Sequence, residues 1–586
     1  VRGGRGGAVV KAPLPERLIA ILARERRAGA MQLRDVHALS LEERVEAGEA
    51  VKELAVVSSG KDGYTLACPE FVARFRAGDT LYLGDGTAID AGAAVVFREY
   101  DPIRSLVLVD HDRFAAPRPL PAVGAGAKLV LDRRDADFAD RTMAAVRALF
   151  QSPTYAAARE LLIGRAPRTQ AVECVAGPER ARALGLDATQ SEAFSAACSQ
   201  PFAFVQGPPG AGKTRLAAAV IGAFVAAGRR VLVTAFTHRA VNNVLEAVAR
   251  TDPSAPIVKI GAERQFEGLD RTRVQSVPTA RAWRDQGGAC VVGVTTHAAP
   301  GLLGQQFDLA LVDEAGQVSL AHACAVLPLA RRLVCVGDHL QLPPLVIAEH
   351  RDPLARRSLF QHMHELYGSF LLSSTYRMNA ELCEFPSRAF YGGRLVAAAQ
   401  NAAQRLCIAG DVSPILAPDP PAVIVPQHHR GARVMSHAEA RLAADLVIAA
   451  VRGGVAPTEV AVIAPHRAHG NRVRALLRRG LPELSAELLP VVDTVERLQG
   501  GERDLIVLSF AASDPQAVLG EAQFFFSPNR LNVSLTRARK KLIVLLSERL
   551  LDAYPDDPES LRGSDLLRRL WSTLPRVEGP ASAAGA

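Results

Sequence analysis

The chain has 586 residues, of which 48% are hydrophobic and 22% charged, so it has the composition of a globular protein with room for about three or four domains rather than of a disordered one. Lys and Arg number 69 against 61 Asp and Glu, and the net charge of +8 favours a polyanionic partner. Strand-sized apolar runs exclude a membrane helix and a signal-peptide core, and cysteines without any CxxC pair argue against zinc or iron–sulfur modules, so we expect a cytoplasmic protein with buried, reduced thiols.

Residues 1–52 are predicted to form an N-terminal tail and stalk helices. The opening VRGGRGG contains too few repeats for an arginine-glycine nucleic-acid tail, and a disordered end is favoured. Because the chain begins at Val1 without an initiator Met, it can be processed, trimmed or cut from a longer polypeptide. From Pro13 to about Val51 the apolar pattern is helical, and Ser40-Leu41-Glu42-Glu43 reads as a capping box.

Residues 53–131 change to a strand-like period with turn signals such as Asp62-Gly63 and Asp85-Gly86. This spacing predicts a small β-barrel. A scaffold and a module that grips nucleic acid are both compatible with it, and the sequence does not decide between them. Residues 132–169 return to a helical pattern, which places the barrel between two helices, like a head on a stalk.

Two α/β domains are predicted next, at 170–370 and 371–555. In each, short apolar strands alternate with helical segments, as in parallel sheets that are buried on both faces. Residues 556–586 are expected to contain a short helix around Ser564–Trp571, followed by a disordered tail. The fold class is therefore α/β, with a barrel inserted ahead of the first α/β domain.

A phosphate-binding loop follows the predicted strand Phe202–Val205. It has glycines at the spacing that lets backbone N–H groups approach phosphate oxygens at a helix N-terminus. Lys213 would reach the β- and γ-phosphates, and Thr214 would bind Mg²⁺. The loop residues are Gly207, Pro208, Pro209, Gly210, Ala211 and Gly212. The pattern indicates a nucleoside triphosphate without saying how its energy is used.

Polar residues also follow two later strands of the same predicted sheet. Asp313 and Glu314 come after Leu309–Val312, at the edge where open α/β sheets bind ligands. Asp313 is placed to hold Mg²⁺ through water, and Glu314 to orient or deprotonate the attacking water. Gln341 follows Leu333–Val336 and is a candidate sensor of the γ-phosphate.

Six motifs in order resemble those of superfamily 1 helicases. They are GPPGAGKT, VDEAGQ, GDHLQLPP, Thr375–Asn379, Val495–Glu502 and Arg530–Arg539. The pattern is most similar to the 5′-to-3′ branch, superfamily 1B, which contains the RNA-surveillance helicase of nonsense-mediated decay, senataxin and the nuclease-helicases of DNA replication. The resemblance implies two tandem RecA-like P-loop domains, with the barrel on its helical stalk inserted before the phosphate loop.

The resemblance also implies ATP and Mg²⁺ as cofactors and gives roles to further residues. It assigns Gln190 to the adenine base, Tyr376 to a position beside the nucleotide and Glu502 to a position near the ribose. Arg377 and Arg537 would reach across from the second domain as arginine fingers. One domain would then hold the phosphates, and the other would complete the charge stabilisation when the cleft closes.

Nucleic acid would lie across the tops of both domains. The resemblance makes Thr237, His238, Asn242, Thr295 and Thr296 candidates for backbone phosphate contacts, which suit sequence-independent binding. Aromatic residues make up only 5% of the chain, so extensive base stacking is not expected. The stretch between Val244 and Val291 is short, so the helical insertion that some relatives carry there, and its regulation, are not transferred to this chain.

We therefore expect a nucleic-acid-dependent ATPase that moves 5′ to 3′ on single-stranded DNA or RNA and separates strands at a duplex junction. One alternative is a protein-displacing translocase that unwinds poorly, and another is the motor half of a larger nuclease-helicase, with a nuclease or other protein partner. A P-loop NTPase unrelated to nucleic acid is disfavoured by the paired motifs of Arg377 and Arg537. The choice between DNA and RNA, the pathway and the oligomeric state are not encoded in these patterns.

Overall fold

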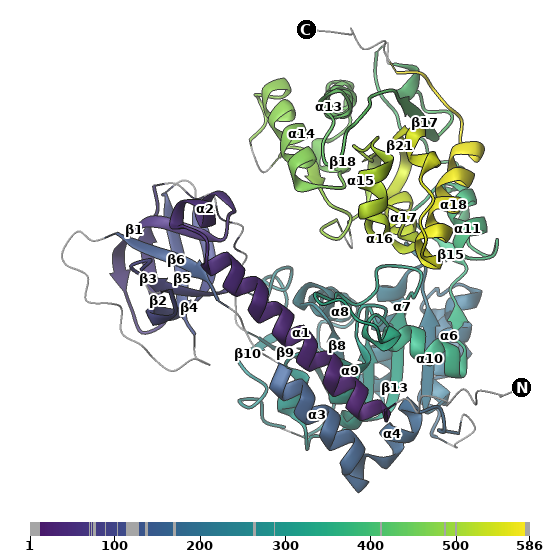
Figure 1. The fold of residues 1–586 in the computed structure, drawn as a ribbon. Helices are drawn as coiled ribbons and strands as arrows, with labels where there is room; N and C mark the ends of the chain where they lie inside the picture. The colour runs from purple at the N-terminus through teal and green to yellow at the C-terminus, as the bar shows by residue number, and fades with distance from the viewer. Residues whose placement is uncertain are drawn as a thin grey trace, which may run out of the picture.

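The chain folds into a barrel on a helical stalk and two stacked α/β domains (Figure 1). The computed structural model describes residues 12–579 apart from 70, 72, 74, 76–77, 88, 102–103, 113–127, 135–138, 168–171, 262–264, 286, 411–412, 486–487 and 499–500. The tails predicted at the two ends fall largely outside the described residues. Among those that are described, no helix is both long and apolar enough to cross a bilayer.

The barrel is closed and antiparallel, with strand order β1-β2-β5-β4-β3-β6. Alternate inward side chains such as Leu54, Leu81 and Leu83 fill its interior. A buried ion pair of 2.8 Å between Arg44 and Asp132 fastens the short helix ahead of the barrel to its last strand. The strands are β1 (Ala50–Ser59), β2 (Gly63–Ala67), β3 (Thr80–Gly84), β4 (Ala93–Asp101), β5 (Leu106–His111) and β6 (Leu129–Arg133).

Helices on both sides of the barrel in sequence form the stalk. They are α1 (Leu14–His37), α3 (Ala139–Gln151) and α4 (Ala156–Leu162), whereas α2 (Leu41–Glu46) is the short helix that packs on the barrel itself. Two contacts hold α1 to the first α/β domain. Arg17 makes two hydrogen bonds to Asp352, at 2.8 and 2.7 Å. Glu25 accepts hydrogen bonds from two successive backbone N–H groups, at 2.8 and 2.9 Å, and from the His350 ring at 2.6 Å.

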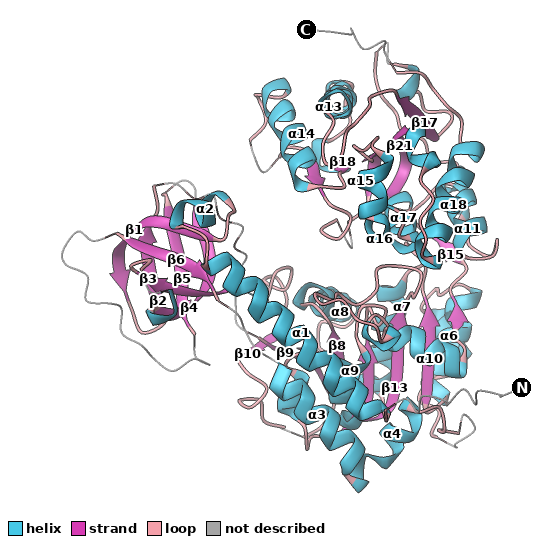
Figure 2. Ribbon diagram, viewed as in Figure 1, coloured by secondary structure: helices cyan, strands magenta, loops and turns pink. Residues whose placement is uncertain are grey.

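The first α/β domain contains an eight-stranded sheet of order β10-β9-β11-β8-β12-β13-β7-β14, in which every pairing is parallel. The apolar core is divided between the two faces of the sheet: α6, α7 and α8 cover one face, and α1, α3, α9 and α10 cover the other (Figure 2). This double burial explains why its strands are almost continuously hydrophobic. The strands are β7 (Phe202–Gln206), β8 (Arg230–Ala235), β9 (Ile257–Ile260), β10 (Gln275–Val277), β11 (Cys290–Thr295), β12 (Phe307–Val312), β13 (Ala330–Gly337) and β14 (Phe370–Leu371), and the helices are α5 (Pro178–Ala183), α6 (Ala188–Ser199), α7 (Lys213–Ala226), α8 (His238–Thr251), α9 (Leu320–Val326) and α10 (Leu359–Tyr367).

The second α/β domain contains a five-stranded parallel sheet of order β17-β21-β20-β18-β19. Helices α11, α17 and α18 cover one face, and α13 and α14 cover the other. Helix α18 is longer than the predicted segment Ser564–Trp571 because Asp557 caps it further upstream. The elements are β15 (Ser374–Thr375), α11 (Ala380–Phe390), β16 (Val396–Ala397), α12 (Ala399–Ala402), β17 (Ala422–Gln427), α13 (His437–Arg452), β18 (Val460–Ile463), α14 (Arg467–Gly480), β19 (Val491–Asp493), β20 (Arg503–Ser509), α15 (Pro515–Gly520), α16 (Ala522–Phe525), α17 (Pro528–Leu535), β21 (Ala538–Ser547) and α18 (Pro558–Thr573).

The predicted architecture, two tandem α/β domains with a small barrel on a helical stalk, is confirmed. The prediction of buried thiols is only partly right. All eight cysteines are free, and five are buried, but Cys174 and Cys407 are exposed and Cys290 is half-buried. Apolar sequence neighbours do not bury Cys174 and Cys407, which lie in connecting segments rather than within a helix or strand.

Candidate functional site

The two α/β domains meet where Thr375 and Tyr376 hydrogen-bond to the phosphate loop, a boundary that we call the cleft, and each sheet contributes a different edge to it. Three adjacent strands of the first sheet, β12, β13 and β7, end at this cleft, and the loops after them carry the predicted ATP residues. In the second sheet, Glu502 directly precedes β20 and Arg537 directly precedes β21, the strand paired with it. The carboxyl edge of one sheet therefore faces the amino edge of the other.

The phosphate loop is shaped by glycines in the left-handed region. Gly210 has a φ of 75° and Gly212 a φ of 78°. A Cβ at Gly210 would lie 2.5 Å from the Cβ of Arg377, so the second domain approaches the loop too closely for any side chain there. Lys213 is the first residue of α7, and its Nζ donates to the Gly207 carbonyl at 2.9 Å.

The two carboxylates after β12 lie in unequal environments. Asp313 is only 4% exposed, and its buried Oδ1 has no hydrogen-bond partner among the described residues. Burial, together with the charge of Glu314, raises the pKa of Asp313 to about 7, although Lys213 opposes the shift. Glu314 has a φ of 47°, an uncommon conformation for a non-glycine residue that often marks functional sites.

The residues present at this point fit a divalent cation. The unpartnered oxygen of Asp313 is a buried acceptor, and Thr214 supplies a hydroxyl from the first turn of α7. Carboxylate and hydroxyl oxygens are the ligands that Mg²⁺ takes in nucleotide sites. Among the described residues, including this point, no group of three or more His, Cys, Asp or Glu side chains is arranged to hold a metal ion, so Asp313 and Thr214 would leave most ligand positions to phosphate oxygens and water.

Gln341 lies beside the same loop. Its Nε2 donates to Asp338 Oδ2 at 2.9 Å and to the Gly207 carbonyl at 3.3 Å. Lys213 and Gln341, the two side chains predicted to reach the γ-phosphate, therefore converge on one carbonyl oxygen. An incoming phosphate oxygen would compete with that carbonyl for both donors.

Two arginines of the second domain lie at its boundary with the first domain: Arg377 is close to the phosphate loop, and Arg537 is close enough to interact electrostatically with Glu314. Arg377 Nε bonds Glu502 Oε2 at 2.5 Å, and its Nη1 donates to the Thr536 carbonyl at 2.9 Å. Arg537 is 4% exposed and donates to the Gly501 carbonyl at 3.3 Å, but it makes no ion pair within the described part of the chain. Burial and the charge of Arg377 lower the pKa of Arg537 to about 9. A buried cation without a carboxylate partner is expected to bind an anion.

Gln190 and Tyr376 are linked through Asp187, a residue that the sequence analysis did not predict to take part. Gln190 is fully buried, forms a reciprocal capping box with Asp187 and donates from Nε2 to the Ala211 carbonyl at 3.0 Å. The Tyr376 hydroxyl donates to Asp187 Oδ2 at 2.8 Å. These contacts tie the start of α6 to the phosphate loop, and the adenine role of Gln190 stays a prediction.

The nucleic-acid candidates lie on the next strands of the same edge, after β8 and β11. Thr237 is exposed and caps α8 by accepting from the Ala240 N–H at 3.2 Å. His238 is half-buried, and its Nδ1 lies 3.0 Å from Nζ of Lys259, a fully buried lysine whose pKa burial lowers to about 7.

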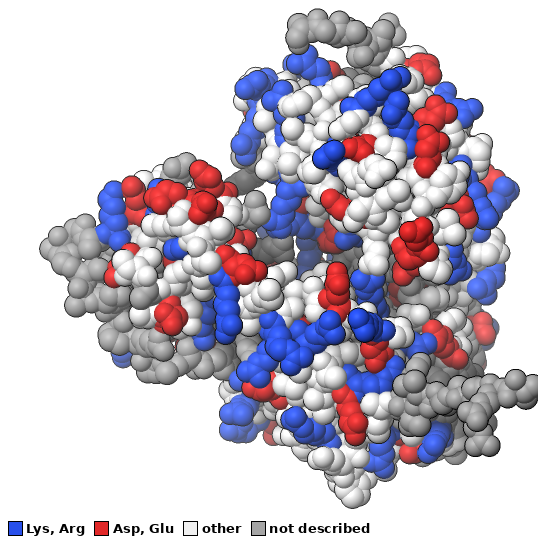
Figure 3. Space-filling view, viewed as in Figure 1, with Lys and Arg blue, Asp and Glu red and all other residues white. Residues whose placement is uncertain are grey.

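The other three candidates are buried. Asn242 is 2% exposed and donates from Nδ2 to the carbonyls of residues 265 and 267, at 2.8 and 3.0 Å. Thr295 and Thr296 are 5% and 0% exposed. The structure therefore places only Thr237 and His238 where they can reach a bound strand without rearrangement. In Figure 3, Lys and Arg side chains line the hollow between the barrel and the two α/β domains.

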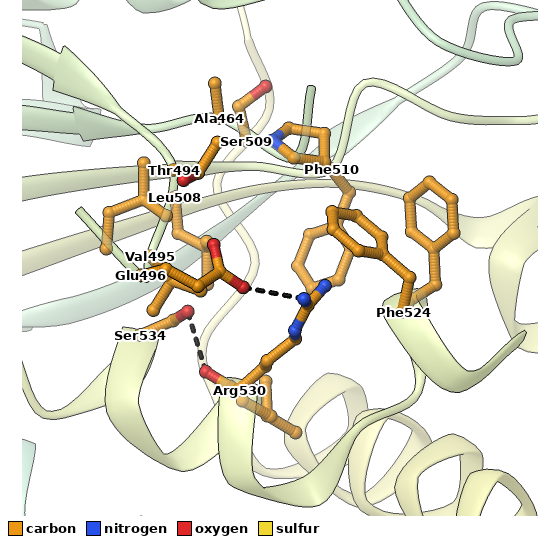
Figure 4. A pocket seen from close by; sticks show the side chains of 14 residues that line it. Ala464, Thr494, Val495, Glu496, Leu508, Ser509, Phe510, Phe524, Arg530 and Ser534 are labelled. Atoms are coloured by element: carbon orange, nitrogen blue, oxygen red, sulfur yellow. Dashed lines mark hydrogen bonds and ion pairs between the residues drawn. The ribbon is translucent and has the colours of Figure 1, made fainter. Parts of the chain in front are cut away.

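A pocket lies in the second domain, near the carboxyl ends of β18 and β20 (Figure 4). Arg530 pairs with Glu496 at 2.7 Å across it and lies 4.1 Å from the ring centre of Phe524. None of its lining residues was predicted as a site residue, and the ATP candidates do not line it. It is a separate feature of the second domain.

Comparisons with known proteins agree with these motifs. Two family models described as AAA domain match residues 185–410 and 355–549. The mouse DNA replication ATP-dependent helicase/nuclease DNA2 is 29% identical over 410 residues, which cover 63% of this chain and 38% of that protein. The regulator of nonsense transcripts 1 homolog of Arabidopsis thaliana is 28% identical over 427 residues, covering 63% and 33%. The chain thus spans about a third to two fifths of the length of these curated relatives.

Among solved structures, the arterivirus nonstructural protein 10 helicase is similar with a TM-score of 0.39 and 13% identity, covering 85% of this chain and 76% of that chain. A complex of that helicase with DNA has a TM-score of 0.35 and 16% identity, covering 65% of each chain.

Proposed function

We propose that the chain is a helicase of superfamily 1B, an ATP-driven motor that moves 5′ to 3′ along single-stranded nucleic acid and separates duplexes. The observation that carries this proposal is Arg537, a buried cation of the second domain that interacts electrostatically with Glu314 of the first domain and has no ion-pair partner among the described residues. A triphosphate bound at the loop would supply the missing negative charge only when both domains are in contact with it.

The chemistry would divide between the two domains. The phosphate loop and Lys213 bind the phosphates, while Asp313 and Thr214 would hold Mg²⁺, which neutralises charge between the β- and γ-phosphates. Glu314 orients or deprotonates the attacking water. Gln341 would transfer a hydrogen bond from the Gly207 carbonyl to the γ-phosphate.

Two contacts support a coupling between nucleotide and domain position. The Tyr376 N–H donates to the Gly210 carbonyl at 2.8 Å, and the Thr375 hydroxyl donates to the Pro209 carbonyl at 2.9 Å. The segment that leads into the second domain therefore rests on the loop that binds phosphate. A change in that loop during hydrolysis would move the second domain relative to the first.

The proposed track for the nucleic acid follows the hollow beside the stalk. Thr237 and His238 lie on the first sheet next to the ATP residues, and the net charge of +8 favours a polyanion. The relatives are named for DNA replication and for nonsense transcripts, so DNA and RNA both remain candidates. A reducing, cytoplasmic compartment is part of the proposal and is supported by eight free cysteines.

Two alternative functions are each supported by a specific observation. The relatives are much longer than the matched region, which favours a motor that works together with a nuclease or another protein. A translocase that displaces proteins and unwinds poorly would use the same cleft. Duplexes with a 5′ or a 3′ single-stranded overhang separate these cases: the proposal expects unwinding from the 5′ overhang alone, and a pure translocase would release a blocking protein without separating strands.

The first test is steady-state ATP hydrolysis by the wild type and by Lys213→Ala, without polymer and with single-stranded DNA or RNA of matched length. We expect a several-fold rise with at least one polymer, and no activity in the variant at any polymer concentration. Arg331→Ala is the control, because Arg331 is exposed near the start of β13, at the opposite edge of the first sheet from the phosphate loop. Hydrolysis that depends on Lys213 but ignores both polymers would contradict the nucleic-acid part of the proposal.

A further inference from the structure

We propose that Tyr391 is a positioning residue for ATP hydrolysis, which holds Asp338 across the domain boundary and thereby fixes the amide of Gln341. The inference rests on the proposed ATP hydrolysis and adds a residue that no comparison assigns. Tyr391 directly follows α11 of the second domain, whereas Asp338 and Gln341 belong to the loop after β13 of the first.

Asp338 is a buried carboxylate, only 2% exposed, and each of its oxygens accepts two hydrogen bonds. Its Oδ1 accepts from Gln206 Nε2 and from the Leu340 N–H, both at 3.1 Å. Its Oδ2 accepts from Gln341 Nε2 at 2.9 Å and from the Tyr391 hydroxyl at 2.7 Å. The carboxylate forms no ion pair within the described chain, so these four donors balance its charge. Three of them belong to the first domain, and Tyr391 alone comes from the second.

The direction of the hydrogen bonds at Tyr391 is fixed by its other neighbour. Asn532 Nδ2, on α17, donates to the Tyr391 oxygen at 2.8 Å and to the Leu340 carbonyl at 2.8 Å. An amide nitrogen only donates, so the single phenolic proton is left for Asp338. Burial and the charge of Asp338 raise the pKa of Tyr391 well above its usual value, which keeps that proton in place at any working pH. The chain of donors therefore runs from Asn532 through Tyr391 to Asp338.

This chain ends at the phosphate loop. The Gln341 amide that bonds Asp338 also donates to the Gly207 carbonyl, where Lys213 Nζ arrives at 2.9 Å. Asp338 thus decides where the Gln341 amide points. Tyr391 belongs to the second domain. Its hydrogen bond to Asp338 therefore makes the orientation of the Gln341 amide depend on the relative position of the two domains. Leu342, from the same loop, belongs to the same hydrophobic core of the second domain as Tyr391, so this part of the loop is packed with the second domain.

Tyr391→Phe tests the hydroxyl while keeping the ring in the core. The variant leaves Asp338 with three donors and removes the acceptor of one Asn532 bond. We expect kcat for ATP hydrolysis to fall roughly tenfold, as one hydrogen bond to a buried charge predicts. KM for ATP should stay within about twofold, because the bonds of the ground-state nucleotide to the phosphate loop are unchanged.

A double-mutant cycle separates positioning from general damage. If Tyr391 acts through Gln341, then Tyr391→Phe added to Gln341→Ala slows hydrolysis no further than Gln341→Ala alone. Losses that multiply in the double variant would overturn the inference, since they would mean that the two side chains act independently.

Tyr367→Phe is the matched control. Tyr367 is also a buried tyrosine whose hydroxyl has two partners: it donates to the Leu161 carbonyl at 3.0 Å and accepts from the Ala166 N–H at 3.2 Å. It lies between the stalk and the first domain, away from the cleft, so its variant should lose thermal stability with kcat unchanged. An equal kcat loss in both variants would make the Tyr391 effect merely structural and reject the inference.

The rates are compared both without polymer and with saturating single strand, which keeps the two proposals apart. A wild type that hydrolyses ATP but does not respond to polymer counts against the helicase motor, and the ratio of Tyr391→Phe to wild type on the basal rate still tests Tyr391. A ratio of one on both rates contradicts the positioning role even if the motor is fully active.

Discussion

The two α/β domains are both parallel sheets, yet they supply the cleft from opposite ends of their strands. The first places its predicted catalytic residues in loops that follow β7, β12 and β13, and the second places Glu502 and Arg537 just before β20 and β21. The rule that open α/β sheets bind ligands at their carboxyl edge therefore describes only the first sheet. The second sheet instead contributes residues from its amino edge, and these residues approach the site only because the two domains are in contact.

The strongest test of this comparison is Arg537→Ala. If the amino edge of the second sheet supplies transition-state charge, kcat for ATP hydrolysis should fall roughly a thousandfold. Binding of a fluorescent ATP analogue should change little, because the phosphate loop is intact. The control is Arg549→Ala, an exposed arginine just beyond the other end of β21. A loss of affinity that matches the loss of rate would instead make Arg537 a ground-state contact.

Glu502→Gln tests whether Glu502 and Arg377 act together at the amino edge of the second sheet. The substitution removes the charge that pairs with Arg377 at 2.5 Å and leaves two arginines facing the cleft with less compensation. We expect kcat to fall roughly tenfold, as when a charged hydrogen bond is lost. In an Arg377→Ala background the same change should cost little more. If the losses of kcat from Glu502→Gln and Arg377→Ala multiply fully in the double variant, Glu502 acts on something other than Arg377.

The candidate nucleic-acid residues at the carboxyl edge of the first sheet differ in exposure, because Asn242 is buried and Thr237 is exposed. The two are therefore expected to differ in role. Asn242→Ala removes two hydrogen bonds to the 265–267 segment and should lower the free energy of unfolding by about 2 kcal/mol. Thr237→Ala removes a helix cap and should cost about 1 kcal/mol. Denaturant unfolding measures both. Binding of a labelled single strand should weaken more for Thr237→Ala, and the opposite order would place Asn242 on the track.

The smallest expected effect is a pH-dependent change in Tm that is caused by one buried lysine in each sheet. Burial lowers the pKa of Lys259 to about 7 and that of Lys541 to about 8. Above the folded-state pKa and below about 10.5, the unfolded chain binds a proton that the folded chain does not, so the free energy of unfolding rises with pH across that window. We expect Tm of the wild type to rise relative to Lys259→Met by about 2 °C per pH unit from pH 7, and relative to Lys541→Met from pH 8. Differences in Tm that do not vary with pH would show both lysines to be charged in the fold.

Local patterns were sufficient to predict the architecture and the phosphate loop. Buried parallel strands read as short apolar runs, and Gly207 to Thr214 carries its loop geometry within eight residues. The barrel followed from the strand-like period and from the spacing of the predicted strands and turns. The domain boundaries at 170–370 and 371–555 and the roles of the site residues stay predictions, because no comparison tests them.

The missed residues depend on contacts between distant parts of the chain. Tyr391 meets Asp338 across 53 residues of sequence, and Tyr376 meets Asp187 across 189. No local period encodes such a pair. The burial of Asn242 was not predicted for the same reason: the two carbonyl groups that accept its hydrogen bonds belong to residues 23 and 25 positions further along the chain. The resemblance supplied Arg377 and Arg537, which spacing alone did not predict.

The two anchors of α1 lie in the first half of the helix, so a small displacement at the second anchor becomes a larger displacement at the end that carries the barrel. Arg17 and Glu25 are eight residues apart, about 12 Å along a helix, and the helix runs on to His37, about 18 Å beyond Glu25. If Arg17 is the fulcrum, a displacement of about 1 Å at Glu25 becomes about 2.5 Å at His37, by the ratio of the two arms. Glu25 is held by residues 347–350, a few positions after Gln341. Helix α1 is thus a direct physical connection between the segment that follows Gln341 and the barrel.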